Sequence, residues 1–239
     1  MNKRKILMLA LSLCMVAILA VGGTLAYFMD TDAATNVFTV GNVAIDLTEN
    51  FAENRVLVPA TGSAQGGTLQ NGITKEVFVT STGSEEAYVR VHIAIPAVLD
   101  DGADTFDAAN NVLHFNYDPA SIGAGKWDWS KTADDDVYEG NWNAYTATID
   151  NVEYNVYVVT YTTALTKDKT TPSAMTQVYL DSTVTNEDVT LIKETLGENW
   201  KILVVAEGAQ ADGFANAYDA LNTAFGVPGV DYTPWDAAD

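Results

Sequence analysis

The histidines and serines of this sequence are not spaced like those of common hydrolases. The chain holds two histidines, His92 and His114, which are 22 residues apart. Zinc proteases place two histidines one helical turn apart with a glutamate between them, so that one helix face supplies both nitrogens and the general base. Neither an HExxH motif nor a GxSxG elbow occurs. We therefore predict no catalytic residues; the alternative is a zinc site formed by both histidines and a carboxylate.

Two runs of aspartates offer a different chemistry, because Ca²⁺ prefers carboxylate oxygens in loops. Neither run has the ligand spacing of an EF-hand, and a solvated acidic loop is the simpler interpretation in so acidic a chain. We predict no metal site and keep Ca²⁺ as a weak candidate cofactor. The candidate ligands are Asp100, Asp101, Asp104 and Asp107, and the second run is Asp134, Asp135 and Asp136.

Arg90 is the most informative charge, because it stands in the middle of the apolar stretch 87–95. Alternate residues of a strand share a face, so Arg90 and His92 lie opposite Val89 and Val91. One interpretation is a structural charge that pairs with an interior or edge carboxylate and fixes the register of the sheet. The other interpretation is an arginine that faces outward into solvent.

Aromatic side chains gather in a stretch rich in loop-forming residues. They are Trp127, Trp129, Trp142 and Tyr145. Such a group is typical of a carbohydrate or subunit contact, and equally of a small core beneath a long loop. The sequence leaves both interpretations open.

Strands must position most of these residues, because apolar side chains alternate with period two along much of the chain. Strands are expected at 36–47, 73–80, 87–95, 114–117, 144–149, 152–161, 175–180 and 202–206, and short helices at 186–197 and 214–225. The alternation changes parity near Gly41 and Asn42, which predicts a bulge there. Many short strands separated by turns indicate an all-β fold with minor helices, an antiparallel β-sandwich resembling a jelly roll.

The first 26 residues have the composition of a secretory signal peptide. Three basic residues precede the apolar segment 6–21, which glycines then end. Thr24 and Ala26 place small side chains at the minus-three and minus-one positions of a cleavage site, so we expect the mature chain to begin at Tyr27. The alternative is an uncleaved anchor, because 6–28 has the length needed to cross a bilayer.

The mature chain, 27–239, is long enough to bury the core of one domain, and a single domain is expected. Within it, 27–48 is the N-terminal arm and first strand. Nine basic residues stand against 32 acidic ones, a net charge of −23 that phosphate backbones would repel. Cys14 lies in the signal, so the mature chain holds neither disulfides nor thiolate metal sites.

Three segments share a pattern with a known family. In 22–47, a small-residue cleavage site is followed by the aromatic pair Tyr27 and Phe28, an acidic residue and a strand. In 81–93, a glycine-serine turn precedes an aromatic residue and an arginine, and 204–214 ends a strand with a polar exit. These segments resemble the TasA/camelysin family of secreted biofilm-matrix proteins, with the first segment the most specific.

The resemblance implies a jelly-roll subunit whose signal is removed by a dedicated ER-type signal peptidase. In the best-known members, the segment freed by cleavage completes the sheet of the next subunit and so builds fibres. An open sheet edge accepts such a strand through main-chain hydrogen bonds. Here the flexible arm would be 30–35, and the alternative is that 27–48 pairs within its own domain. The expected assembly strand contains Asn36, Phe38, Val40, Gly41, Val43 and Ile45.

These observations together predict a secreted structural protein of the extracellular or biofilm matrix or cell surface that assembles with copies of itself. Its other expected partners are the signal peptidase and an anchoring matrix protein; nucleic acid and, after cleavage, membrane are not expected. One alternative is a camelysin-like surface metalloprotease, because some relatives carry that label. The other is a non-polymerising surface adhesin that binds glycan through the aromatic stretch.

We expect the exported protein to begin at Tyr27, because Thr24 and Ala26 follow the glycines at the distance that processing requires. Intact-mass and N-terminal peptide mass spectrometry of secreted protein checks this. A start more than a few residues away, or a retained 1–26 segment, would contradict it.

Overall fold

The computed structural model describes residues 29–32, 42–51, 56–61, 70–99, 112–116, 126–129, 145–197 and 200–237. The strands are β1 (Met29–Asp32), β2 (Ile45–Phe51), β3 (Ile73–Ser81), β4 (Ala87–Pro96), β5 (Leu113–Asn116), β6 (Trp127–Asp128), β7 (Tyr145–Ile149), β8 (Val152–Leu165), β9 (Gln177–Leu180) and β10 (Leu203–Gln210). The helices in this part of the chain are α2 (Asn186–Leu196), α3 (Ala217–Phe225) and the 3-10 helices η1 (Ala97–Leu99) and η3 (Pro234–Ala237).

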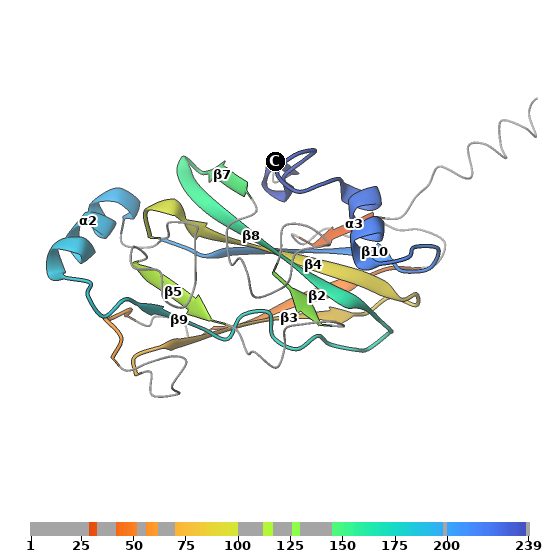
Figure 1. Cartoon of the computed structure of the whole chain (residues 1–239), viewed down its shortest axis with the longest axis horizontal. Coiled ribbons are helices and arrows are strands. Elements are labelled where there is room, and N and C mark those ends of the chain that lie inside the picture. Colours follow the sequence, from red (N-terminus) through yellow and green to blue (C-terminus); the bar gives the residue numbers. More distant parts are fainter. Residues whose placement is uncertain are drawn as a thin grey trace, which may run out of the picture.

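The strands form two antiparallel sheets that pack face to face as a sandwich (Figure 1). The larger sheet has the order β1-β10-β4-β8-β6, with β7 also paired to β8, and the smaller sheet has the order β2-β3-β9-β5. Figure 1 shows α2 at one end of the molecule and α3 beside the larger sheet, on the side away from the smaller one. The predicted all-β sandwich with minor helices is confirmed.

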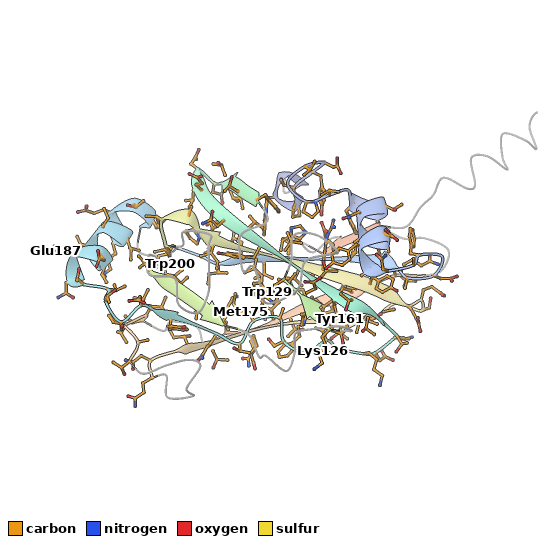
Figure 2. The ribbon with its side chains drawn as sticks, in the orientation of Figure 1. Lys126, Trp129, Tyr161, Met175, Glu187 and Trp200 are labelled. Carbon is orange, nitrogen blue, oxygen red and sulfur yellow. The ribbon has the colours of Figure 1, made fainter. Side chains whose placement is uncertain are left out.

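The core between the sheets follows from the alternating pattern. Val89 and Val91 of β4 join Val77 and Val79 of β3 in one cluster, and all four side chains are fully buried. Burying a side chain of this kind stabilises the fold by roughly 1.5–3 kcal/mol. Figure 2 places Trp129 in the same layer. The alternate apolar residues of β4, which include Val89 and Val91, therefore face the smaller sheet.

The opposite face of β4 is buried as well. Ala94 packs with Tyr154 and Val156 of β8 in a second apolar cluster, against which Trp235 of η3 lies. Tyr88 packs on a third cluster, formed by residues of β10 and α3. Because both faces of β4 are covered, every polar side chain on this strand needs a partner inside the protein.

The N-terminal segment differs from the sequence expectation. Residues 30–35 were expected to form a flexible arm, but Met29–Asp32 are strand β1, which pairs with 206–209 of β10. The expectation is wrong for 30–32 because main-chain hydrogen bonds to a strand edge do not require apolar alternation.

Most of the predicted strand 36–47 lies outside the described residues. Its described end belongs to β2, which continues to Phe51 and pairs with β3. The bulge predicted at Gly41 and Asn42 falls at the border of the described residues. The described register shift interrupts the β4–β8 pairing instead, between Ala87 and Val89.

The turn between β3 and β4 holds the residues just before β2 through close backbone contact. Ser84 donates its amide to the Asn42 carbonyl at 2.8 Å and accepts the Asn42 amide on its hydroxyl at 3.2 Å. The amides of Thr82 and Gly83 both donate to the Ala44 carbonyl. A Cβ at Gly83 would lie 2.1 Å from the Asn42 carbonyl oxygen, so only glycine permits this approach.

We expect Gly83→Ala to destabilise the protein by about 1–3 kcal/mol, because the added methyl group forces two backbone segments apart. Urea unfolding of the mature chain measures the difference. Thr82→Ala is the matched control, since Thr82 is exposed in the same turn and its substitution should cost less than about 0.5 kcal/mol. Equal losses in the two variants would contradict the steric explanation.

Candidate functional site

An ion pair lies buried on the outer face of the larger sheet. Arg90 of β4 stands directly opposite Glu207 of β10, and its Nε donates to Glu207 Oε2 at 2.5 Å. Arg90 is 2% exposed, while Glu207 and the neighbouring His92 are fully buried. The structure thus gives Arg90 the interior carboxylate partner of the first sequence interpretation, and not an outward orientation.

The rest of the Arg90 guanidinium binds α3 and the chain that follows it. Nη1 donates to Asn222 Oδ1 at 2.8 Å, and Nη2 donates to the Gly226 carbonyl at 3.1 Å and to the Tyr232 hydroxyl at 2.8 Å. The guanidinium carbon also lies 5.7 Å from the ring centre of Phe225, as in a cation–π contact. A single side chain therefore joins two strands to a helix and the C-terminal segment.

His92 extends this set of bonds toward β7. Its Nε2 lies 3.2 Å from Glu207 Oε2, and its Nδ1 lies 3.0 Å from the Tyr145 hydroxyl. Trp235 Nε1 donates to that hydroxyl at 3.0 Å, and the Tyr232 hydroxyl donates to Glu207 Oε1. With the Tyr145 hydroxyl donating to Nδ1 and the His92 hydrogen on Nε2, each of these donors has an acceptor and the imidazole is neutral.

The same contacts set the ionisation of the carboxylate. Burial raises the pKa of Glu207, but the hydrogen bond and charge interaction with His92, the charge of Arg90 and the hydrogen bond from Tyr232 outweigh burial and bring the pKa to about 2. The unfolded chain therefore binds this proton first as the pH falls. The interaction contributes its full stability above about pH 4.5 and loses it as the pH falls from there to about 2.

Burial also shifts the pKa values of the two other titratable groups, His92 and Tyr232. It lowers the pKa of His92 against the opposing hydrogen bond and charge of Glu207. It raises the pKa of the Tyr232 hydroxyl, and the Glu207 charge adds to this effect. The histidine is therefore neutral and the tyrosine a hydrogen-bond donor at neutral pH.

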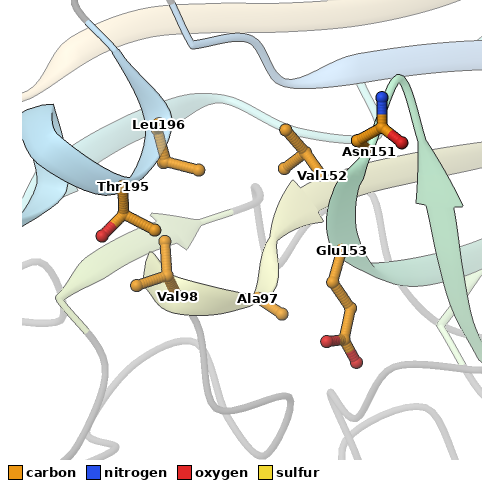
Figure 3. A pocket seen from close by; sticks show the side chains of 7 residues that line it. All are labelled: Ala97, Val98, Asn151, Val152, Glu153, Thr195 and Leu196. Atoms are coloured by element: carbon orange, nitrogen blue, oxygen red, sulfur yellow. The ribbon is translucent and has the colours of Figure 1, made fainter.

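In this polar network, defined as Arg90, His92, Tyr145, Glu207, Asn222, Tyr232 and Trp235, the central groups Arg90, His92 and Glu207 are buried. A separate groove of about 390 Å³ lies between η1, the β7–β8 turn and the end of α2 (Figure 3). Its lining is mostly apolar, with Glu153 its one titratable side chain, and no member of the network contributes to it. The network joins strands of the larger sheet to α3 and to the chain that follows it.

The two histidines considered for a zinc site belong to different sheets. His92 is on β4 of the larger sheet and His114 is on β5 of the smaller sheet. Among the described residues, no group of three or more histidine, cysteine or carboxylate side chains is placed to hold a metal ion. The candidate calcium ligands Asp100, Asp101, Asp104 and Asp107 lie outside the described residues, as do Asp134, Asp135 and Asp136.

The aromatic stretch is divided between two layers. Trp127 and Trp129 are in the main core, and Trp127 Nε1 donates to the Pro172 carbonyl at 2.7 Å. Tyr145 belongs to the polar network, and Trp142 lies outside the described residues. A surface contact through Trp127 and Trp129 is therefore wrong, because these indoles fill the space between the sheets.

The expected assembly strand is described only in part. Val43 and Ile45 are buried in the core of their own domain, and Ile45 packs on Gly208 of β10. The described portion thus pairs and packs within its own chain. The other residues expected in this strand, Asn36, Phe38, Val40 and Gly41, lie outside the described residues, as do the cleavage-site residues Ala26 and Tyr27.

The carboxylate at the centre of the network was missed by sequence reasoning. Glu207 is the one charged residue in the apolar stretch 203–211, which is the same signal that singled out Arg90 on β4. Arg90 and Glu207 are opposite charges that each stand alone in an apolar strand, and this pattern predicts that they pair. Asn222 and Tyr232 carry no comparable signal, because their roles depend on where α3 packs.

Comparisons with family models, curated proteins and solved structures give no match to this chain. No helix in the described part of the chain has the length and apolar character needed to span a membrane.

We expect Glu207→Gln to destabilise the protein by about 3–5 kcal/mol at neutral pH, because it leaves the Arg90 charge buried without a counterion. The matched control is Glu194→Gln, since Glu194 is exposed on α2. A surface substitution of this kind changes stability by less than about 0.5 kcal/mol. Chemical denaturation of both variants measures the difference, and similar losses would show that the burial of the network carries no special stability.

Proposed function

We propose that this chain is a secreted structural protein of an extracellular matrix whose subunits assemble by exchanging strand β1. The observation that carries the proposal is the place of β1 in the fold. It is the edge strand of the larger sheet, and of the named strands it pairs with β10 alone. A four-residue edge strand can leave its sheet at a small cost compared with a central strand.

Exchange of β1 between two chains uses the same backbone pairing with β10 that β1 makes within one chain. The register that joins Met29 to Ala209 and Asp32 to Ala206 within one chain serves equally well between two chains. Each subunit then accepts β1 from one neighbour and donates its own to the next, a head-to-tail contact that continues as a filament. Main-chain hydrogen bonds supply the affinity, as in other cases of β-strand addition.

The remainder of the domain suits a subunit better than a catalyst. The conspicuous charged groups, Arg90 and Glu207, are buried and engaged with each other. The described groove is lined mainly by apolar and uncharged residues. The mature chain lacks cysteine, so its stability must come from packing and buried hydrogen bonds. Both are extensive in this domain.

The setting that we propose follows from the N-terminal sequence and the charge. Segment 1–26 directs export and is removed by an ER-type signal peptidase, which frees the chain just ahead of β1. The net charge of −23 disfavours nucleic acid as a partner. Attachment to the cell surface would pass through the filament or an anchoring matrix protein.

We expect a disulfide between Met29→Cys and Ala209→Cys to trap whichever chain supplies β1. These two positions are directly opposite in the antiparallel pair, within the reach of a disulfide, and the mature chain contributes no other thiol. Oxidation before assembly should give closed monomers that form no fibres in electron micrographs until they are reduced. Oxidation after assembly should give covalent ladders on non-reducing gels.

Each single-cysteine variant is the control and should assemble with or without oxidant. Deletion of 27–35 provides an independent arm. It should leave a folded monomer by circular dichroism that no longer polymerises, at the cost of a few hydrogen bonds of ~1 kcal/mol each. Normal fibres from locked monomers or from the deletion variant would refute exchange of β1.

A further inference from the structure

The sequence contains one asparagine that is followed by a glycine, the pair Asn71 and Gly72 just before β3. Both residues are exposed to solvent. The main-chain nitrogen of a residue can attack the side-chain amide carbon of a preceding asparagine, and glycine presents this nitrogen without a Cβ in the way. Asparagine is one of the thermolabile residues of proteins. The pair therefore puts a reactive amide next to an unhindered nucleophile.

The structure gives the Asn71 amide a part in joining two segments. Asn71 has a φ of 67°, in the left-handed region that asparagine adopts at a lower cost than most residues. Its Nδ2 donates to the Pro59 carbonyl at 3.2 Å. Beside it, Gln70 and Thr61 exchange two main-chain bonds, from the Gln70 amide at 2.8 Å and from the Thr61 amide at 3.3 Å. The Asn71 side chain thus helps to hold segment 56–61 against the chain that enters β3.

Segment 56–61 covers apolar groups beside the smaller sheet. The Ala60 amide donates to the Leu180 carbonyl of β9 at 3.0 Å, and Ala60 is buried. Leu57 is half-buried and packs against the main core. Release of the segment would therefore bring Ala60 and Leu57 into contact with water.

We propose that Asn71 is a site of spontaneous deamidation, and that its conversion releases segment 56–61 from the start of β3. The Gly72 nitrogen attacks Asn71 Cγ, so that an N–Cγ bond forms and the Cγ–Nδ2 bond breaks. The amide group leaves as ammonia with the proton of the Gly72 nitrogen. Water then opens the cyclic imide at either carbonyl, which gives aspartate or isoaspartate. The proposal concerns a single folded chain and does not depend on exchange of β1.

Both products remove the bond to Pro59. The amide nitrogen of Asn71 is a donor, whereas the carboxylate of either product only accepts, so two acceptors would face each other. Isoaspartate also adds a methylene group to the main chain between Gln70 and Gly72, which displaces the Gln70–Thr61 pairing relative to β3. Segment 56–61 then opens more often.

Peptide mass spectrometry of the aged mature protein tests the modification. After incubation at neutral pH, the peptide that contains Asn71 should gain the mass difference between an amide and a carboxyl group. It should also separate into aspartate and isoaspartate forms on chromatography. Conversion should be faster at mildly alkaline pH, because the attacking nitrogen has to lose its proton.

Asn151 is the matched control within the same molecule. It is exposed and has a φ of 65°, but the branched side chain of Val152 hinders attack by the nitrogen that follows it. Conversion should be at least ~tenfold faster at Asn71 than at Asn151, and Gly72→Val, which copies the Asn151 pair, should slow it to the same extent. Equal rates at the two asparagines of the wild-type protein, or conversion of Asn71 only after denaturation, would overturn the proposal.

Hydrogen–deuterium exchange tests the release of the segment. Asn71→Asp should speed the exchange of the Ala60 and Gln70 amides by about fivefold, the effect of one lost hydrogen bond. Asn151→Asp adds the same charge elsewhere and should leave these amides unchanged. Aged wild-type protein should show the faster exchange in its converted fraction. Unchanged exchange in both Asn71→Asp and the aged protein would refute the release of segment 56–61.

Discussion

Burial of β4 on both faces is the constraint on which the rest of the structure depends. A strand covered on one side could carry Arg90 and His92 into solvent. Here the smaller sheet covers one face, and α3 with the C-terminal residues 226–237 covers the other. A charge in this position is tolerated only with a counterion and with partners for each N–H group, and Glu207 supplies the counterion from the neighbouring strand.

This requirement specifies the register of the larger sheet. The β4–β10 pairing sets Arg90 against Glu207 and His92 against Val205. A slip by one residue would place the arginine opposite Ala206 or Gly208 and turn the carboxylate toward the apolar core. Apolar strands alone discriminate weakly between such registers, whereas a buried ion pair penalises each wrong one strongly.

The same requirement reaches the end of the chain. Asn222, Gly226 and Tyr232 occupy the remaining arginine donors, so the position of α3 is tied to the sheet it covers. Gly226 and Gly229 both have positive φ, at 93° and 71°, which lets the chain turn back over the network. At the other end of the chain, the N-terminal segment joins both layers, since β1 is in the larger sheet and β2 in the smaller. Exchange of β1 would therefore link subunits through a segment whose other half stays anchored in its own core.

The sequence by itself determined the class of fold, because period-two alternation in 73–95 and 152–161 reflects half-buried strands whatever their order. It also marked Arg90 as a charge out of place. It did not show β1, since edge pairing uses main-chain groups that every residue carries, and it did not separate core from surface for Trp127 and Trp129. Tertiary structure alone decided that His92, Asn222, Tyr232 and Trp235 meet in one hydrogen-bonded network. Their separation along the chain leaves no local pattern, and only the packing of α3 and residues 226–237 on the second face of β4 brings them within hydrogen-bonding distance.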